Sequence, residues 1–219
     1  MSLIVNEGSR TAIPLLAEDV YPAVCTMLVD LGDQYSEKFG NTQRKVLISF
    51  ELPGEKLDNG ETRRLSNTYT ASLNSKGNLR KDLIAWRGRD FTVDELKKFD
   101  LRNIVGAPCM LSVIHKVGQD GTKRAVIGGI MKLPKGMPAP VMSGEPVVYD
   151  LDNPDAVQKL AELPEWIQTR IKDSETWKNM MDEQSYARTE AAAKADEDAP
   201  ADPTHAYDEL SDSDGELPF

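Results

Sequence analysis

The side chains of residues 44–52, RKVLISFEL, alternate in character and constrain the fold most strongly. Every second residue is apolar, which gives Val46, Ile48, Phe50 and Leu52. Successive side chains of a strand point to opposite faces, so this strand has one face for a core. Turn-forming residues follow in PGEKLDNG, and then comes the Thr-rich stretch 61–72, ETRRLSNTYTAS. The pattern predicts a β-hairpin.

The rest of residues 1–144 alternates between strand-like and helix-like periods. Three further strands are predicted, at 20–31 (VYPAVCTMLVDL), 108–117 (PCMLSVIHKV) and 122–133 (TKRAVIGGIMKL). A polar loop is expected at 32–43. Residues 75–87 place Leu79, Leu83 and Trp86 on one helical face, so Trp86, like Phe50, is expected in the core. Thr92 and Glu95 have the spacing of a capping box and predict a short second helix.

The order of these elements is strand, strand, strand, helix, strand, strand. This is the order of the OB-fold, a five-stranded Greek-key barrel with a helix between strands three and four. The chain is therefore expected to be mainly β and to adopt that fold. Another small α+β barrel is the alternative that the periods alone allow.

Three domains are expected along the chain. Residues 1–144 form the OB-fold domain, which ends in a stretch at 134–146 with four prolines and two glycines. Residues 145–184 read as short helices, begun by Asn153-Pro154-Asp155, that pack back on the barrel. Residues 185–219 are rich in Ala, Glu, Asp, Pro and Ser and have little to bury, so we expect a disordered acidic tail.

The net charge of −10 is distributed unevenly. Residues 1–144 hold 20 Lys and Arg against 16 Asp and Glu, which gives +4, and residues 145–180 hold 4 against 8. Residues 181–219 hold 2 against 12, which gives −10. A basic body with an acidic tail indicates that the body meets a polyanion and that the tail has another task.

Several classes of protein are disfavoured by the sequence. No apolar run approaches the roughly 18 residues that span a bilayer, and no signal peptide precedes the first strand, so we expect a cytoplasmic protein without a membrane partner. Cys25 and Cys109 are expected to be buried free thiols, with a disulfide as the lesser alternative. His115 and His205 have no nucleophile or metal-ligand spacing around them. No enzyme, metal or cofactor is expected.

Basic and aromatic residues are interleaved in the expected barrel, which is the composition of a single-strand binder. In an OB-fold the face of strands two and three, with the loops between strands one–two and four–five, forms the usual binding surface. The residues expected to contact DNA are Tyr35, Phe39, Arg44, Lys45, Arg63, Arg64, Tyr69, Lys116, Lys123, Arg124 and Lys132. Tyr69 fits a core position equally well, and Lys135 lies near the same strand ends.

The acidic tail closes on an apolar group, in DELSDSDGELPF. An apolar ring beside carboxylates can be recognised by a pocket with a basic rim, and the acids would speed the encounter. The residues expected to bind a partner are Asp212, Asp214, Glu216, Leu217, Pro218 and Phe219.

This tip resembles that of bacterial single-stranded DNA-binding proteins, which end in acids followed by Ile-Pro-Phe. Leu217 stands where those proteins have isoleucine, and Ser211, Ser213 and Gly215 interrupt the acids. The body resembles a bacteriophage group of single-stranded DNA-binding proteins, through RKVLISFELP at 44–53, LRKDLIAWRGRDFT at 79–92 and LRNIVGAPCMLSVIHK at 101–116. That likeness spans roughly residues 10–180.

The resemblance implies an OB-fold, sequence-independent binding of single-stranded DNA, and a tip that recruits proteins of replication or recombination. Our functional expectation is therefore a non-enzymatic DNA-binding protein of phage replication or recombination, with a homo-oligomer left open. The alternatives are a metal-dependent nuclease, a protein-binding adaptor and a single-strand annealing protein.

Overall fold

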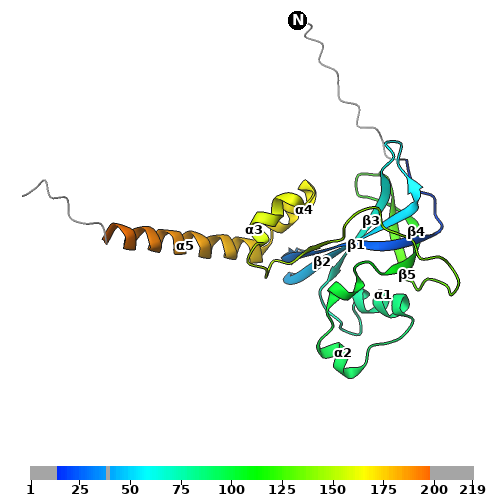
Figure 1. The fold of residues 1–219 in the computed structure, drawn as a ribbon, viewed down its shortest axis with the longest axis horizontal. Helices are drawn as coiled ribbons and strands as arrows, with labels where there is room; N and C mark the ends of the chain where they lie inside the picture. Colours follow the sequence, from blue (N-terminus) through cyan, green and yellow to red (C-terminus); the bar gives the residue numbers. More distant parts are fainter. Residues whose placement is uncertain (1–13, 38–39, 198–219) are drawn as a thin grey trace, which may run out of the picture. The chain divides into compact units, whose positions relative to one another are not determined.

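The computed structural model describes residues 14–37 and 40–197, and the fold is mainly β (Figure 1). The strands are β1 (Val20–Ser36), β2 (Asn41–Lys56), β3 (Thr62–Thr70), β4 (Pro108–Val117), β5 (Lys123–Met131) and β6 (Val147–Tyr149). The helices are α1 (Asn78–Arg87), α2 (Val93–Lys97), η1 (Leu101–Ile104), α3 (Ala156–Lys159), η2 (Leu160–Glu162), α4 (Glu165–Lys172) and α5 (Glu175–Glu197). Within these described ranges no helix is long and apolar enough to cross a membrane.

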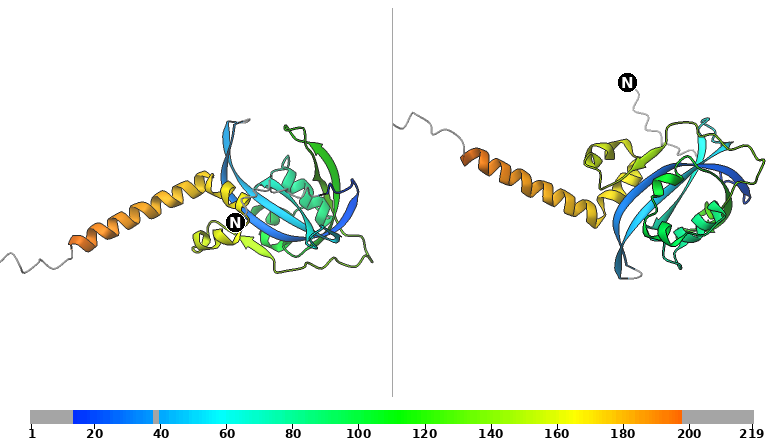
Figure 2. Two further views of the ribbon diagram at one scale, coloured as in Figure 1. Left: turned by 90° about the horizontal axis from the view of Figure 1, so that it is seen from above. Right: turned by 60° about the horizontal axis from the view of Figure 1, so that its bottom comes forward.

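The strands form one sheet in the order β3-β2-β1-β4-β5. Neighbours along this path are antiparallel, and β6 adds to β1 in parallel, opposite Met27 to Val29. The two end strands, β3 and β5, also contact each other. The sheet curves around α1, which lies on its concave side (Figure 2).

The predicted hairpin of β2 and β3, the strand at 108–117 and the capping box of Thr92 and Glu95 are confirmed. The predicted polar loop at 32–43 is wrong. The strand β1 continues to Ser36 and β2 begins at Asn41, with Tyr35 paired to Thr42. Ladder hydrogen bonds join backbone groups, so a polar hairpin can extend beyond the apolar core. The short strand β6 was not predicted.

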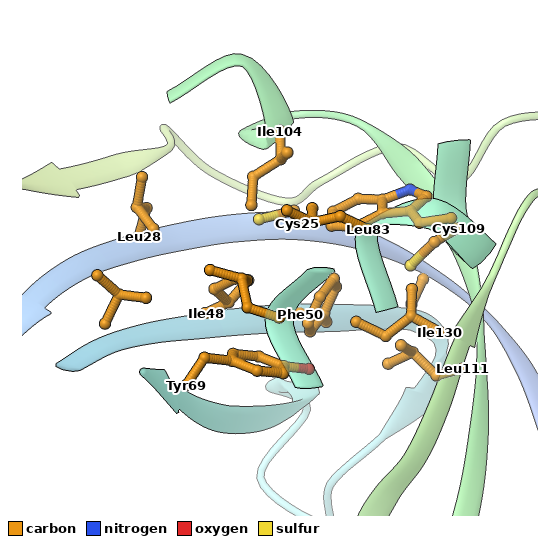
Figure 3. Close-up of a cluster of buried hydrophobic side chains, with 14 of the residues drawn as sticks. Cys25, Leu28, Ile48, Phe50, Tyr69, Leu83, Ile104, Cys109, Leu111 and Ile130 are labelled. Atoms are coloured by element: carbon orange, nitrogen blue, oxygen red, sulfur yellow. The ribbon is translucent and has the colours of Figure 1, made fainter. Parts of the chain in front are cut away.

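The main core lies between the concave face of the sheet and α1. It contains the alternating residues of β2, with Phe50 fully buried and its ring centroid 5.4 Å from that of Trp86. Figure 3 shows Phe50 among Ile48, Leu83 and Leu111, which come from three different elements. Cys25 and Cys109 are buried in the same cluster, and burial raises the pKa of the Cys25 thiol to about 12. The core positions of Phe50 and Trp86 are confirmed.

A second apolar layer covers the other face of β1 and β2. Val29, Leu31 and Leu47 are at most 2% exposed there, and the segment from β6 to the start of α5 supplies buried partners on that side. Those partners are Tyr149, Leu151, Ile167, Ile171 and Trp177. Gly32 has φ +71°, and a Cβ there would lie 2.7 Å from Ser174 Oγ, so the close approach of β1 to this segment requires glycine.

Hydrogen bonds fix the same contact. The Gln34 side chain donates to the Arg170 carbonyl at 2.8 Å, and the Arg170 guanidinium donates to Thr68 Oγ1 at 3.0 Å. These contacts join the segment after β6 to the sheet within the first of two compact units, which ends at Lys178.

The second unit begins at Asn179, within α5. Residues 185–197 are helical, although we expected disorder from residue 185. The stretch ARTEAAAKADE combines good helix formers, and intrinsic propensity can support a helix without apolar burial. The rest of the predicted tail lies outside the described residues.

Candidate nucleic-acid interface

A polar cleft of about 570 Å³ opens beside strands β2 and β3 and the loop that leads into α1. We call it the β2–β3 cleft. It is lined by Gln43, Lys45, Asn67, Thr68, Tyr69, Thr70, Ser72, Asn74, Lys76, Gly77 and Asn78. These described lining residues include two lysines, many amides and hydroxyls, and no Asp or Glu. Such a surface attracts an anion and offers it many hydrogen-bonding groups.

Lys45 is the lysine of this cleft that the sequence identified. The β2–β3 register places it opposite Thr70. Its ammonium donates to Gln43 Oε1 at 2.8 Å and to Thr70 Oγ1 at 2.7 Å. Both acceptors are uncharged, and in the described part of the chain neither Lys45 nor Lys76 has an ion-pair partner. The two charges are therefore not neutralised locally.

The loop before α1 turns the start of that helix toward the cleft. The Asn74 side chain accepts from the Lys76 backbone N–H at 3.1 Å, and the Asn74 carbonyl accepts from the Gly77 N–H at 2.8 Å. A Cβ on Gly77 would lie 3.1 Å from the Asn74 oxygen, which explains the glycine. Gly77 caps α1 without a side-chain hydrogen bond. The first N–H groups of α1 thus add partial positive charge beside Asn78.

Tyr69 lines this cleft but does not offer its ring. Its exposure is 3%, and its hydroxyl donates to Asp82 Oδ2 at 2.7 Å. Burial, with the hydrogen bond to Asp82 as a second cause, raises the pKa of Tyr69. A base cannot stack on a buried ring, so the expectation that Tyr69 contacts DNA by stacking is wrong. The ring belongs to the core beside Ile48 (Figure 3).

Arg44, next to Lys45 in sequence, lies in a different cavity. This acidic cavity of about 240 Å³ is lined by Leu28, Asp30, Arg44, Val46, Asp100, Leu101, Arg102, Val148, Tyr149, Asp150 and Asp152. The Arg44 guanidinium donates a hydrogen bond through Nε to Asp30 Oδ2 at 3.1 Å and another through Nη2 to Asp152 Oδ1 at 3.0 Å. The hydrogen bond with Asp30 is the main cause of the raised pKa of Arg44. Its charge is already paired, so we leave Arg44 out of the interface.

The two arginines of β3 lie at the far end of that strand from Tyr69. Arg64 pairs with Glu51 across the ladder, with Nη2 3.5 Å from Glu51 Oε2, and its side chain is 57% exposed. Glu51 is 1% exposed and accepts from the backbone N–H of Ser143 at 3.0 Å. Arg63 is half-buried opposite Leu52. Arg64 can therefore reach a phosphate only while it remains close to a buried carboxylate.

The remaining candidates lie on two hairpins and one strand end. Tyr35 is 61% exposed in the β1–β2 hairpin, so its ring is accessible. Lys116, Lys123 and Arg124 are exposed in the β4–β5 hairpin, where Arg124 pairs with Asp120. Lys132 follows β5 and lines a separate apolar pocket. Phe39 and the six tail residues from Asp212 to Phe219 lie outside the described residues.

Sequence reasoning missed most of the cleft. Lys76 and Asn78 lie within the helix predicted at 75–87, and Asn74 lies just before it. The run Asn-Ser-Lys-Gly-Asn at 74–78, ahead of an apolar helical face, is itself a signal of an exposed helix N-terminus. Gln43 and Asn67 carry no sequence signal beyond their polarity. Among the His, Cys, Asp and Glu side chains in the described ranges, no group of three is placed to hold a metal ion.

No family model matches this chain, and no curated protein matches it.

Proposed function

We propose that this chain binds single-stranded DNA without sequence preference, as a non-enzymatic protein of phage DNA replication or recombination. The observation that carries the proposal is the β2–β3 cleft, with Lys45 and Lys76 unneutralised and with no carboxylate among its described lining residues. Binding of single strands depends on neutralising phosphates, and the backbone of a single strand is flexible enough to follow such a cleft.

The proposal includes the OB-fold. Its support is the strand order β3-β2-β1-β4-β5, the contact between the end strands β3 and β5, and the position of α1 between β3 and β4. In that fold strands two and three carry nucleic acid. The cleft lies on the same strands, so the fold proposal and the site proposal support each other.

Base stacking would come from the hairpins. Tyr35 offers an exposed ring, and Phe39 is a second aromatic residue, four positions further along the sequence. Lys116 and Lys123 of the β4–β5 hairpin would contact phosphates at a distance from the cleft. The DNA-binding set that we propose is therefore Tyr35, Phe39, Lys45, Lys76, Arg63, Arg64, Lys116, Lys123, Arg124 and Lys132.

The acidic segment supplies a second proposed role, which rests on sequence alone. Residues 181–219 hold 12 acids against 2 bases, and Leu217, Pro218 and Phe219 form their apolar group. We propose that these residues dock a partner protein of replication or recombination. Removal of Phe219 should abolish capture of that partner and leave DNA affinity intact.

Fluorescence anisotropy with labelled oligo-dT, against a duplex of the same length, tests DNA binding at several salt concentrations. We expect preference for the single strand and a linear fall of log affinity with log salt. Equal affinity for the single strand and the duplex, or an affinity that does not change with salt concentration, would refute the proposal. Magnesium-dependent cleavage of the oligonucleotide would favour a nuclease instead, and catalysed pairing of complementary strands would favour an annealing protein.

A further inference from the structure

The C-terminal end of α1 borders an apolar pocket that, apart from its edge residue Lys132, lies outside the proposed DNA-binding set. Its volume is about 450 Å³, within the range of pockets that bind small ligands or single side chains. Trp86, Phe99 and Ala107 contribute apolar wall, and Arg87, Asn103 and Lys132 contribute polar groups. We call it the α1 pocket.

The polar groups of the α1 pocket are basic or neutral. Of the described residues that line it, none is Asp or Glu. Lys132 reaches the pocket because Gly88 has no side chain: a Cβ there would lie 2.9 Å from Lys132 Cδ. The Lys132 backbone N–H also donates to the Ala85 carbonyl at 3.2 Å, which fixes the lysine beside the end of α1. An apolar wall with a basic edge is complementary to an apolar group that carries a negative charge.

The Arg87 guanidinium lines this pocket and lies beside two aromatic rings. Its guanidinium lies 4.3 Å from the ring centroid of Phe91 and 5.2 Å from that of Phe99. Its Nη2 bonds to Glu95, but its Nη1 is buried and has no partner within the described structure. Glu95 therefore already pairs the charge of Arg87, and among the described lining residues Lys132 is the one whose charge is left for a carboxylate.

We propose that the α1 pocket binds an acidic peptide segment of a partner protein, with one large apolar side chain in the pocket and a carboxylate on Lys132. A nucleobase is the poorer fit. Trp86 is 6% exposed, so too little of its ring is accessible for a base to stack on it. An aliphatic or aromatic side chain needs only apolar contact.

The probe for this proposal is a fluorescein-labelled peptide of about ten residues, with one central Leu between Asp-Glu pairs, titrated with the full chain. We expect a Kd of roughly 10–100 μM. Replacing the central Leu by Ser should weaken binding by about tenfold or more. Replacing the acids by their amides should weaken binding to a similar degree. Raised salt should weaken binding of the acidic peptide and not that of the amide peptide.

Two variants locate the site. Ala107→Leu fills the pocket and should abolish peptide binding while oligo-dT binding stays unchanged, because Ala107 is outside the DNA-binding set. Lys132→Glu reverses the basic edge and should weaken the peptide by about tenfold or more. Lys135→Glu, three residues further on and outside the pocket lining, is the matched control and should change peptide affinity by less than about twofold. Circular dichroism melting identifies any variant that fails to fold.

The outcomes are distinguishable from a failure of the DNA proposal. No saturation by the peptide up to about 1 mM, or unchanged binding to Ala107→Leu, would overturn the pocket proposal. Competition of oligo-dT with the peptide, together with weaker oligo-dT binding by Ala107→Leu, would show that a base occupies the pocket and would overturn it as well. Peptide binding that persists while oligo-dT fails to bind would support this proposal and refute the DNA proposal alone.

Discussion

Arg44 and Lys45 are neighbours on β2, and they enter two cavities with opposite electrostatics. Arg44 lies in the acidic cavity, where Asp30 and Asp152 hold its guanidinium. Lys45 lies in the β2–β3 cleft, where its ammonium contacts the neutral side-chain oxygens of Gln43 and Thr70. Adjacent residues of a strand face opposite sides, so one basic pair serves two purposes. Two carboxylates hold the partly buried Arg44, so its charge does not indicate polyanion binding, although Lys45 beside it carries the same charge.

The largest effect should come from removing the unpaired charge. In Lys45→Ala/Lys76→Ala two phosphate contacts are lost, which lowers single-strand affinity by about 50-fold at 0.05 M salt. The slope of log affinity against log salt should become shallower by about 1.4. Anisotropy titrations over a salt series measure both quantities. Lys98→Ala, which removes an exposed lysine outside the cleft, is the control, and equal losses in the two proteins would remove the distinction between the cleft and the general surface.

Removing the paired charge should act on stability and not on DNA. Arg44→Ala leaves Asp30, whose side chain is 12% exposed, without its arginine. We expect the free energy of unfolding to fall by about 1–2 kcal/mol, less than for a fully buried pair because Arg44 is itself partly exposed. Urea denaturation measures this. Arg102→Ala, in the same cavity but paired with a well-exposed Asp100, should cost less than about 0.5 kcal/mol.

A loss of DNA affinity in Arg44→Ala as large as that in Lys45→Ala/Lys76→Ala would contradict the division between the two cavities.

Tyr35 and Tyr69 extend the comparison from charge to base stacking. Tyr35→Ala should weaken oligo-dT binding by about 1 kcal/mol, roughly fivefold, because an exposed ring is lost. Tyr69→Phe should leave oligo-dT binding unchanged and reduce the free energy of unfolding by about 1 kcal/mol, because Asp82 loses its hydrogen bond. Titration and urea denaturation of both variants give the contrast. Weaker oligo-dT binding by Tyr69→Phe, with unchanged binding by Tyr35→Ala, would indicate that Tyr69 contacts DNA.

The smallest effect concerns the shape of the cleft. In Gly77→Ala the new methyl group presses on the carbonyl oxygens of Asn74 and Ser72, at 3.1 and 3.3 Å. The loop must shift by a few tenths of an ångström, so we expect oligo-dT affinity to fall about twofold. Gly60→Ala is no proper control because its φ is +83°. Gly54→Ala, with open space around the position, should leave affinity unchanged.

Local pattern sufficed for elements whose cause is local. The alternation of Val46, Ile48 and Phe50 predicted the core face of β2, and Thr92 with Glu95 predicted the start of α2. Pairing across the chain could not be read in this way. Arg44 donates a hydrogen bond to Asp152, which is 108 residues away in the sequence. Tyr69 donates to Asp82 only because α1 packs on the sheet. Composition likewise predicted disorder for residues 185–197, which are helical because their residues have high helix propensity.

The second apolar layer bears on how the chain can be shortened. A cut after residue 144, at the domain boundary that the prolines suggested, would remove β6, α3 and α4 together. Val29, Leu31 and Leu47 would then meet water, at positions that are at most 2% exposed in the intact protein. A large newly exposed apolar face promotes aggregation. We therefore expect the first 144 residues to aggregate by themselves, and a fragment that extends to Lys178 to keep this layer covered.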